Sequence, residues 1–255
     1  MTTPALECVG VTRRFGGLEA VGDLSLQLAP GERRAILGPN GAGKTTLFRL
    51  ISGEMPVTAG RVRLFGEDIT GMACHRRTHR GLGRTFQITN LFPTLSVLDN
   101  VVLATLGLSR TKYSMVRPLW TYRRERARAE EALVTVGLAD RRDEAVRDLS
   151  HGEQRQVEIA LALLTSPRVL LLDEPTAGLS PAETALMTRT IQKLDPAITI
   201  LLIEHAMDVV FDIVNWVTVL HLGRTFSEGT PSEVRDDPRV QEIYFGAGEM
   251  TRAEG

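Results

Sequence analysis

One eight-residue segment restricts the fold of this chain more than any other feature. Residues 38–45 read Gly-Pro-Asn-Gly-Ala-Gly-Lys-Thr, which fits the pattern G-x-x-x-x-G-K-[ST]. The segment follows a short strand pattern at 33–37 and precedes a helical pattern at 45–52. Such a loop turns successive backbone N–H groups inward as an anion-binding nest, and the helix N-terminus adds partial positive charge. The pattern therefore predicts a phosphate-binding loop in an α/β fold.

Two side chains of this loop have separate expected roles. The Lys44 ammonium would reach the β- and γ-phosphates of a nucleotide, and the Thr45 hydroxyl would coordinate Mg²⁺. Only 3 of the 30 basic residues are lysine, so a lysine at this position fits a need for a compact point charge. The residues predicted to bind nucleotide here are Gly38, Pro39, Asn40, Gly41, Ala42, Gly43, Lys44, Thr45 and Thr46.

A second chemical motif ends the apolar segment Val169–Glu174, which reads Val-Leu-Leu-Leu-Asp-Glu. A continuous apolar run is typical of a buried parallel strand, and ligands bind at the carboxyl edge of such a sheet. Asp173 would therefore lie beside the phosphate loop, where it can hold Mg²⁺ through water. Glu174 would be placed to polarise an attacking water.

A third segment, Leu149–Gln154, has a local interpretation and a functional one. Ser150 followed by Glu153 forms a capping box, S-x-x-E, which predicts the start of a helix covering 156–164. An exposed helix N-terminus with a serine and a glycine can also bind a phosphate. Because that phosphate would crowd the nucleotide at Lys44, we expect it to belong to a nucleotide held by another subunit.

The composition excludes several classes of protein. The 255 residues carry 30 basic and 31 acidic side chains, so the net charge of −1 leaves no chain-wide basic surface for nucleic acid. Aromatic residues make up 5%, too few for an evident base-stacking platform. Cys8 and Cys74 have neither disulfide-framework nor zinc spacing. Neither a signal peptide nor an apolar run of about 18 residues is visible, so we expect no membrane crossing by this chain itself.

The hydrophobic pattern predicts an α/β domain interrupted by a helical insertion. Strands are expected at 6–11, 25–28, 33–37, 61–65, 169–172, 198–203, 217–221 and 224–227. Helices are expected at 45–52, 96–106, 122–136, 156–164 and 181–194. We predict a single domain in which residues 1–87 and 166–245 form the catalytic core, 88–165 the helical subdomain and 246–255 a tail.

The motifs together resemble those of the ATP-binding cassette (ABC) transporter ATPases, and the resemblance covers nearly the whole chain. In chain order the six similar elements are Gly38–Thr45 (Walker A), Gln87 (Q-loop), Leu149–Glu153 (signature), Val169–Glu174 (Walker B), Ala177–Ser180 (D-loop) and His205 (switch histidine). Phe15 stands where this family places an aromatic ring against adenine.

The resemblance implies a fold and an assembly. The fold would be the P-loop NTPase ABC-ATPase fold, with a RecA-like core, an antiparallel β subdomain and a helical subdomain. Two ATPase subunits, identical or paralogous, would pair head to tail and enclose two ATP molecules with Mg²⁺. Transmembrane permease subunits, and indirectly a solute-binding protein, would be partners, which places the chain at the cytoplasmic face of the plasma membrane. Nucleic acid is not an expected partner.

The resemblance also implies residue roles. Glu174 would be the catalytic carboxylate, His205 would contact the γ-phosphate, and Gln87 would link Mg²⁺ and water to the helical subdomain. Together with Lys44 these form the predicted catalytic set. The predicted Mg²⁺ ligands are Thr45, Gln87 and Asp173. The residues predicted to contact the opposite subunit's ATP are Ser150, His151, Gly152 and Glu153.

Three positions depart from the common family pattern. Glu153 stands where the signature commonly has glutamine, a frequent change that keeps the helix cap. His151 stands where the signature usually has glycine, and Ser180 stands where the D-loop usually has aspartate. None of these departures touches Lys44, Glu174 or His205, so ATP hydrolysis is still expected. The absence of an Asn-Lys-x-Asp motif argues against a GTPase switch, and the length leaves no room for a second cassette.

Finer similarity indicates one branch of the family. The segments Arg84–Gln87, Leu91–Pro93 and Ile203–Asp208 resemble importers of the branched-chain amino acid class, whose members also carry urea or short amides. The lipopolysaccharide-export ATPase is the nearest alternative, although it usually has aspartate where this chain has Glu204. The basic cluster at 76–80 could face solvent or a membrane subunit, and the sequence does not decide between them.

Overall fold

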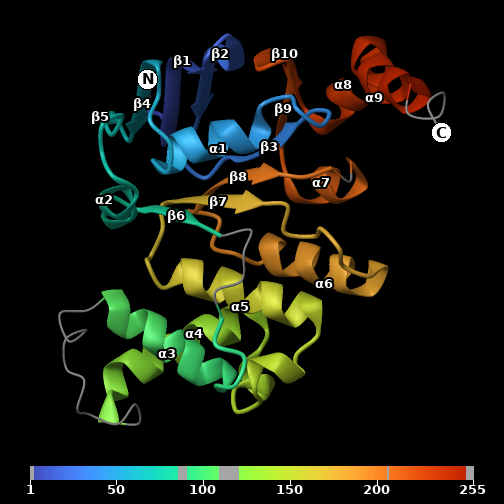
Figure 1. Ribbon diagram of the computed structural model, residues 1–255. Coiled ribbons are helices and arrows are strands. Elements are labelled where there is room, and N and C mark those ends of the chain that lie inside the picture. The colour runs from blue at the N-terminus through green and yellow to red at the C-terminus, as the bar shows by residue number, and fades with distance from the viewer. Residues whose placement is uncertain (1–2, 86–90, 109–120, 206, 251–255) are drawn as a thin grey trace. The chain divides into compact units, whose positions relative to one another are not determined.

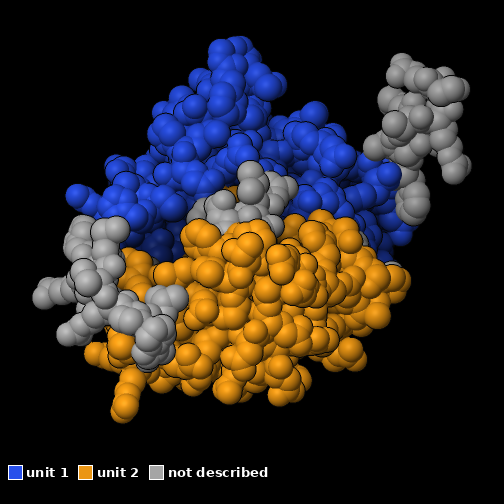
Figure 2. All heavy atoms as spheres, turned by 60° about the horizontal axis from the view of Figure 1, so that its bottom comes forward, with its two compact units in different colours: residues 1–82, 168–174, 197–255 blue, residues 83–167, 175–196 orange. Residues whose placement is uncertain are grey.

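Figure 1 presents the computed structural model of the protein, which describes residues 3–85, 91–108, 121–205 and 207–250. The chain divides into two compact units, coloured separately in Figure 2. The first unit comprises residues 1–82, 168–174 and 197–255, and the second comprises 83–167 and 175–196. Residues 175–196, which the sequence assigned to the catalytic core, are thus grouped with the predicted helical insertion.

An antiparallel sheet with the order β2-β1-β4-β5 lies in the first unit. Its strands are β1 (Leu6–Phe15), β2 (Leu18–Leu28), β4 (Ala59–Leu64) and β5 (Glu67–Asp68). Buried and exposed residues alternate along the end of β2, as expected for a sheet with one face on the core. The β1–β2 hairpin extends well beyond the predicted strands, because polar pairs such as Arg14–Glu19 continue the pairing where apolar alternation stops.

A second sheet has the strand order β10-β9-β3-β8-β7-β6. Its members are β3 (Arg33–Leu37), β6 (Leu82–Arg84), β7 (Val169–Asp173), β8 (Thr199–Ile203), β9 (Trp216–His221) and β10 (Arg224–Gly229). Strand β3 is parallel to both β8 and β9, and β7 is parallel to β8. Every residue of β7 and β8 is buried, which confirms that these apolar runs are buried parallel strands.

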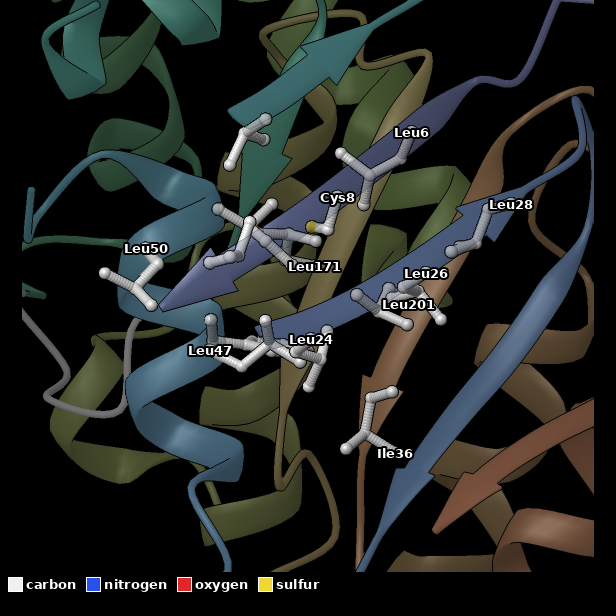
Figure 3. Close-up of a cluster of buried hydrophobic side chains, with 14 of the residues drawn as sticks. Leu6, Cys8, Leu24, Leu26, Leu28, Ile36, Leu47, Leu50, Leu171 and Leu201 are labelled. Carbon is white, nitrogen blue, oxygen red and sulfur yellow. The ribbon is translucent and has the colours of Figure 1, made fainter. Parts of the chain in front are cut away.

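Five helices of the described chain belong to the first unit: α1 (Lys44–Ser52), α2 (Cys74–His79), α7 (Met207–Ile213), α8 (Pro231–Asp236) and α9 (Pro238–Met250). The core is a cluster in which one face of α1 packs against side chains of both sheets (Figure 3). Leu47 and Leu50 of α1 meet Leu24 of β2 and Leu171 of β7 in this cluster. The helix that begins at the phosphate loop is therefore anchored in the core.

The second unit contains α3 (Val97–Leu108), α4 (Arg123–Val136), α5 (His151–Leu163) and α6 (Pro181–Gln192). All four helices were predicted. Helix α5 begins at His151, directly after its Ser150 cap, several residues before the predicted start. In the part of the chain that the structure describes, no helix has both the length and the apolar character to cross a membrane.

The basic cluster at 76–80 contains one buried member, which neither alternative considered for it anticipates. Arg77 is 2% exposed, and its guanidinium donates hydrogen bonds of 2.6–2.8 Å to four backbone carbonyls. These carbonyls belong to Leu50, Ile51, Thr70 and Met72. Two of them lie in the last turn of α1, where carbonyls lack intrahelical partners. Arg77 therefore caps the C-terminal end of the phosphate-loop helix with a cation, which also suits its dipole.

Candidate nucleotide site

The loop from Gly38 to Thr45 joins β3 to α1, as the sequence predicted. Gly38 and Gly43 have φ angles of +149° and +99°, a region that other residues rarely adopt. A Cβ at Gly38 would lie 2.3 Å from the Leu220 carbonyl oxygen, and one at Gly43 would lie 2.5 Å from that of Ala20. Both glycines are therefore required by backbone conformation and by the close approach of neighbouring strands.

Lys44 is the first residue of α1 and is only 6% exposed. Its Nζ donates hydrogen bonds to the carbonyl oxygens of Gly38 at 2.6 Å and Pro39 at 3.0 Å. Burial lowers the pKa of Lys44, while the negative charges of Glu174 and Asp173 raise it. The ammonium thus lies within the loop and within the field of the two carboxylates, as expected for a site that binds phosphate.

The two carboxylates follow one another at the end of β7. Asp173 is the last residue of that strand, is 2% exposed, and lies opposite Ile203 of β8. The Glu174 N–H donates to the Ile203 carbonyl at 2.9 Å, and Glu174 has a φ of +48°. A non-glycine residue held in this left-handed conformation is a form of strain that clusters at functional sites.

His205 follows β8 and meets Glu174 at the same edge of the sheet. Its Nε2 lies 2.8 Å from Glu174 Oε1, within hydrogen-bonding distance. The His205 side chain is 44% exposed and that of Glu174 is 22% exposed, so water can reach both. The pair places a carboxylate and an imidazole side by side where water can reach them.

A cleft of about 420 Å³ opens between these groups. It is lined by Leu18, Glu19, Ala20, Asn40, Gly41, Ala42, Gly43, Lys44, Thr45, Thr46, Glu174, His205, Leu222 and Gly223. All of these residues belong to the first unit. The loop, Glu174 and His205 are therefore brought to one cavity.

Some lining residues escaped sequence reasoning because they lie outside the motifs, at the start of β2 or in the turn between β9 and β10. Leu18 and Leu222 are large apolar side chains that are 67% and 75% exposed. The Gly223 N–H donates to the Ala42 carbonyl at 3.0 Å, which ties the β9–β10 turn to the phosphate loop. The short gap between the strands predicted at 217–221 and 224–227 was the one available signal for this turn. Phe15 is 43% exposed and pairs with Leu18 across the hairpin.

The predicted signature residues lie in the second unit, at the start of α5. The Ser150 hydroxyl accepts from the Glu153 N–H at 3.3 Å, and Glu153 accepts from the Ser150 N–H at 2.8 Å. The predicted capping box is therefore confirmed. The departure at Ser180 also has a local function, because Ser180 caps α6 through a second box of this kind. Gln87 lies outside the described residues.

Comparison with known proteins identifies the family to which this geometry belongs. Residues 21–177 match the ABC transporter family, and residues 224–249 match a family described as branched-chain amino acid ATP-binding cassette transporter. The high-affinity branched-chain amino acid transport ATP-binding protein BraF of Pseudomonas aeruginosa is 38% identical, over 96% of this chain and 99% of BraF. The lipopolysaccharide export system ATP-binding protein LptB of Acidithiobacillus ferridurans is 39% identical, over 89% of this chain and 90% of LptB.

A solved structure gives the same result for the fold. The ADP conformation of MJ1267, an ATP-binding cassette of an ABC transporter, matches with a TM-score of 0.85 and 29% identity. The match covers 96% of this chain and 100% of that one, which confirms the predicted ABC-ATPase fold. The chain therefore belongs to the ABC transporter family, as one of its ATP-binding, ATP-hydrolysing subunits.

Proposed function

We propose that this subunit hydrolyses ATP in the cleft at Lys44 and thereby energises an importer of branched-chain amino acids. The observation that carries the catalytic part is the convergence of Lys44, Glu174 and His205 on one cleft. Lys44 would exchange its two carbonyl contacts for phosphate oxygens, and the loop N–H groups would hold the remaining phosphate charge. The exposed apolar surface of Leu18 and Phe15 would receive the adenine ring.

Glu174 would take a proton from the attacking water, because its carboxylate is partly exposed and oriented by His205. The left-handed backbone conformation at Glu174 sets the direction of its Cα–Cβ bond. The Nε2 of His205, which contacts the Glu174 carboxylate, would contact the γ-phosphate instead when ATP is bound. Catalysis here consists of positioning and charge stabilisation, as in phosphoryl transfer generally.

The residues predicted to hold Mg²⁺ fit that ion: Thr45 lines the cleft, and Asp173 ends strand β7. Asp173 and Thr45 offer carboxylate and hydroxyl oxygens, the hard ligands that Mg²⁺ prefers, and Gln87 would add an amide oxygen. The effect of the Asp173 charge on Lys44 supports a carboxylate close to the phosphate loop. When bound, Mg²⁺ would neutralise charge on the nucleotide phosphates.

A second ATPase subunit, identical or paralogous, would complete the site. The residues that line the cleft at Lys44 all belong to the first unit. The hydrogen-bond donors at the start of α5 belong to the second unit and would bind a nucleotide held by the partner. Ser150, His151, Gly152 and Glu153 would make that contact. The assembled dimer would dock on permease subunits at the cytoplasmic face of the membrane and would receive solute from a binding protein.

The cargo is proposed from the C-terminal segment and from the relatives. Residues 224–249 match the branched-chain amino acid family, and BraF aligns over more of both chains than LptB does. These two observations favour amino acid import over lipopolysaccharide export. The test is uptake by the chain together with its co-purifying membrane proteins: leucine should be transported, and transport of urea, a short amide or lipopolysaccharide instead would overturn this cargo.

The catalytic assignment is tested with Glu174→Gln. This variant should still bind ATP but should lose about 100-fold or more of its turnover, because the proton acceptor is gone. It should also accumulate as an ATP-bound dimer in size-exclusion chromatography. Glu131→Gln, an exposed change on α4, is the control and should behave as wild type. A Glu174→Gln protein with normal turnover that stays monomeric would contradict the proposed role.

A further inference from the structure

Two helices of this chain begin with the same capping sequence. Helix α6 starts with Ser180-Pro181-Ala182-Glu183, and α8 starts with Thr230-Pro231-Ser232-Glu233. In both, the hydroxyl of the first residue accepts from the glutamate N–H, and the glutamate carboxylate accepts from the first residue's N–H. The two boxes are therefore equivalent as local structures.

The carboxylate of Glu183 has a further contact that reaches a second helix. Its Oε1 accepts the backbone N–H of Gly152, at the start of α5, at 3.0 Å. Hydrogen bonds from Ser180, and then those from Gly152 and Ser150, lower the pKa of Glu183 to about 2. Glu183 thus presents a carboxylate to the first turn of α5. The Glu233 carboxylate, in contrast, accepts from the Thr230 N–H and hydroxyl of its own box.

The close approach of Glu183 also explains a glycine. A Cβ placed on Gly152 would lie 3.0 Å from both Cβ and Cγ of Glu183 and 3.1 Å from its Oε1. Gly152 has no positive φ, so packing rather than backbone conformation favours glycine there. The absence of a side chain lets the glutamate lie directly over the N–H that it accepts.

Gly152, whose N–H donates to Glu183, is among the residues assigned above to the ATP of a second subunit. A single N–H cannot donate a full hydrogen bond to a carboxylate and to a phosphate at once. Two anions at the same helix N-terminus also repel each other. The carboxylate must therefore move before the phosphate can take the Gly152 N–H.

We propose that Glu183 is a positioning residue of the signature site, whose carboxylate holds the Gly152 N–H in the single subunit and yields it to the partner's ATP. The inference rests on the proposed dimer. A residue in the first turn of α6, directly after the D-loop, would thereby influence the affinity of the signature residues for phosphate. The influence is inhibitory, since the carboxylate competes with the nucleotide.

The test measures the ATP concentration at which half of the protein is dimeric, by analytical ultracentrifugation of Glu174→Gln protein with Mg²⁺. Adding Glu183→Gln keeps an amide oxygen for the α6 cap and removes the negative charge. Its midpoint should be about 3- to 10-fold lower than that of the parent, because a charged competitor is lost. The matched control is Glu233→Gln, which alters the equivalent cap of α8 and should leave the midpoint unchanged.

A purely structural role for Glu183 cannot produce this result, because loosening the signature helix would raise the midpoint. An unchanged or raised midpoint in the Glu183→Gln protein would overturn the proposal. If Glu183→Gln folds poorly, Glu183→Asp is the second variant. Its shorter side chain cannot reach both the Gly152 N–H and the Ser180 N–H, so a lower midpoint is again expected. If the Glu174→Gln parent fails to dimerise at any ATP concentration, the proposed dimer is wrong. The proposed competition between the Glu183 carboxylate and the partner's ATP is then wrong as well.

Discussion

Individual charged residues of this protein are held in surroundings that would be unfavourable without their specific partners. Lys44 is almost fully buried but is paired with backbone carbonyls and near two carboxylates. Arg77 is more deeply buried, and this burial lowers the pKa of its guanidinium. Backbone carbonyl oxygens surround the guanidinium and accept its hydrogen bonds. In each case the partners offset the desolvation of the charge, and removal of the cation leaves buried acceptors unsatisfied.

This reasoning makes Arg77 a test of stability. Arg77→Met should lower the free energy of unfolding by about 3 kcal/mol, because four carbonyls lose a charged donor and the end of α1 loses its cap. Arg76→Met, at the exposed neighbour, should change it by less than about 0.5 kcal/mol. Urea unfolding of both variants distinguishes the two outcomes. Equal losses would show that the carbonyl contacts do not stabilise the fold.

Elements form here where local chemistry and burial agree. Strand β3 and the start of α6 lie at the positions expected from the sequence, and α5 begins directly after its predicted Ser150 cap, because strand patterns and capping residues act over a few positions. The extension of the β1–β2 hairpin beyond the predicted strands was missed, and so was α2. The hairpin continues through charged cross-strand pairs, and α2 is a six-residue helix whose one buried residue is an arginine.

The cap of α8 provides a prediction at this scale. Thr230→Ala should lower the free energy of unfolding by about 1 kcal/mol, because the Glu233 N–H loses its acceptor. Ser232→Ala, in the same turn, should lower it by less than about 0.5 kcal/mol. Amide hydrogen exchange should accelerate in residues 232–234 of the Thr230→Ala protein and remain unchanged in the control. Unaltered exchange in both would rule out a stabilising cap.

The whole molecule is expected to be stabilised by the nucleotide that it binds. At an ATP concentration 100 times the Kd, binding to the native state alone adds about 2.7 kcal/mol. For a chain of this size that corresponds to a rise in Tm of about 5–10 °C. Thermal unfolding with and without Mg-ATP should show this rise in the wild type and in Lys193→Ala, an exposed lysine. Lys44→Ala should show almost none, and a full shift in that variant would contradict the phosphate-loop assignment.

The candidate site was predictable in its parts and less so in its arrangement. Lys44 and Glu174 each lie in a contiguous motif whose backbone geometry follows from a strand, a glycine loop or a helix start. The sequence alone does not place Leu18 or Leu222 at the same cleft, because one begins β2, the other lies in the turn after β9, and neither is part of a chemical motif. Resemblance to a family supplied the role of His205, which no local pattern indicates.

The sequence by itself determined the phosphate loop, the buried strands and the capped helix starts, because each depends on residues that are neighbours in the chain. Only the tertiary structure decided which of these pieces meet. Glu174 and His205 are 31 residues apart, as are Gly152 and Glu183, and each pair forms a hydrogen bond. Arg77 reaches carbonyls 26 and 27 residues away. Such contacts arise from the packing of whole elements, and no local pattern of residues encodes them.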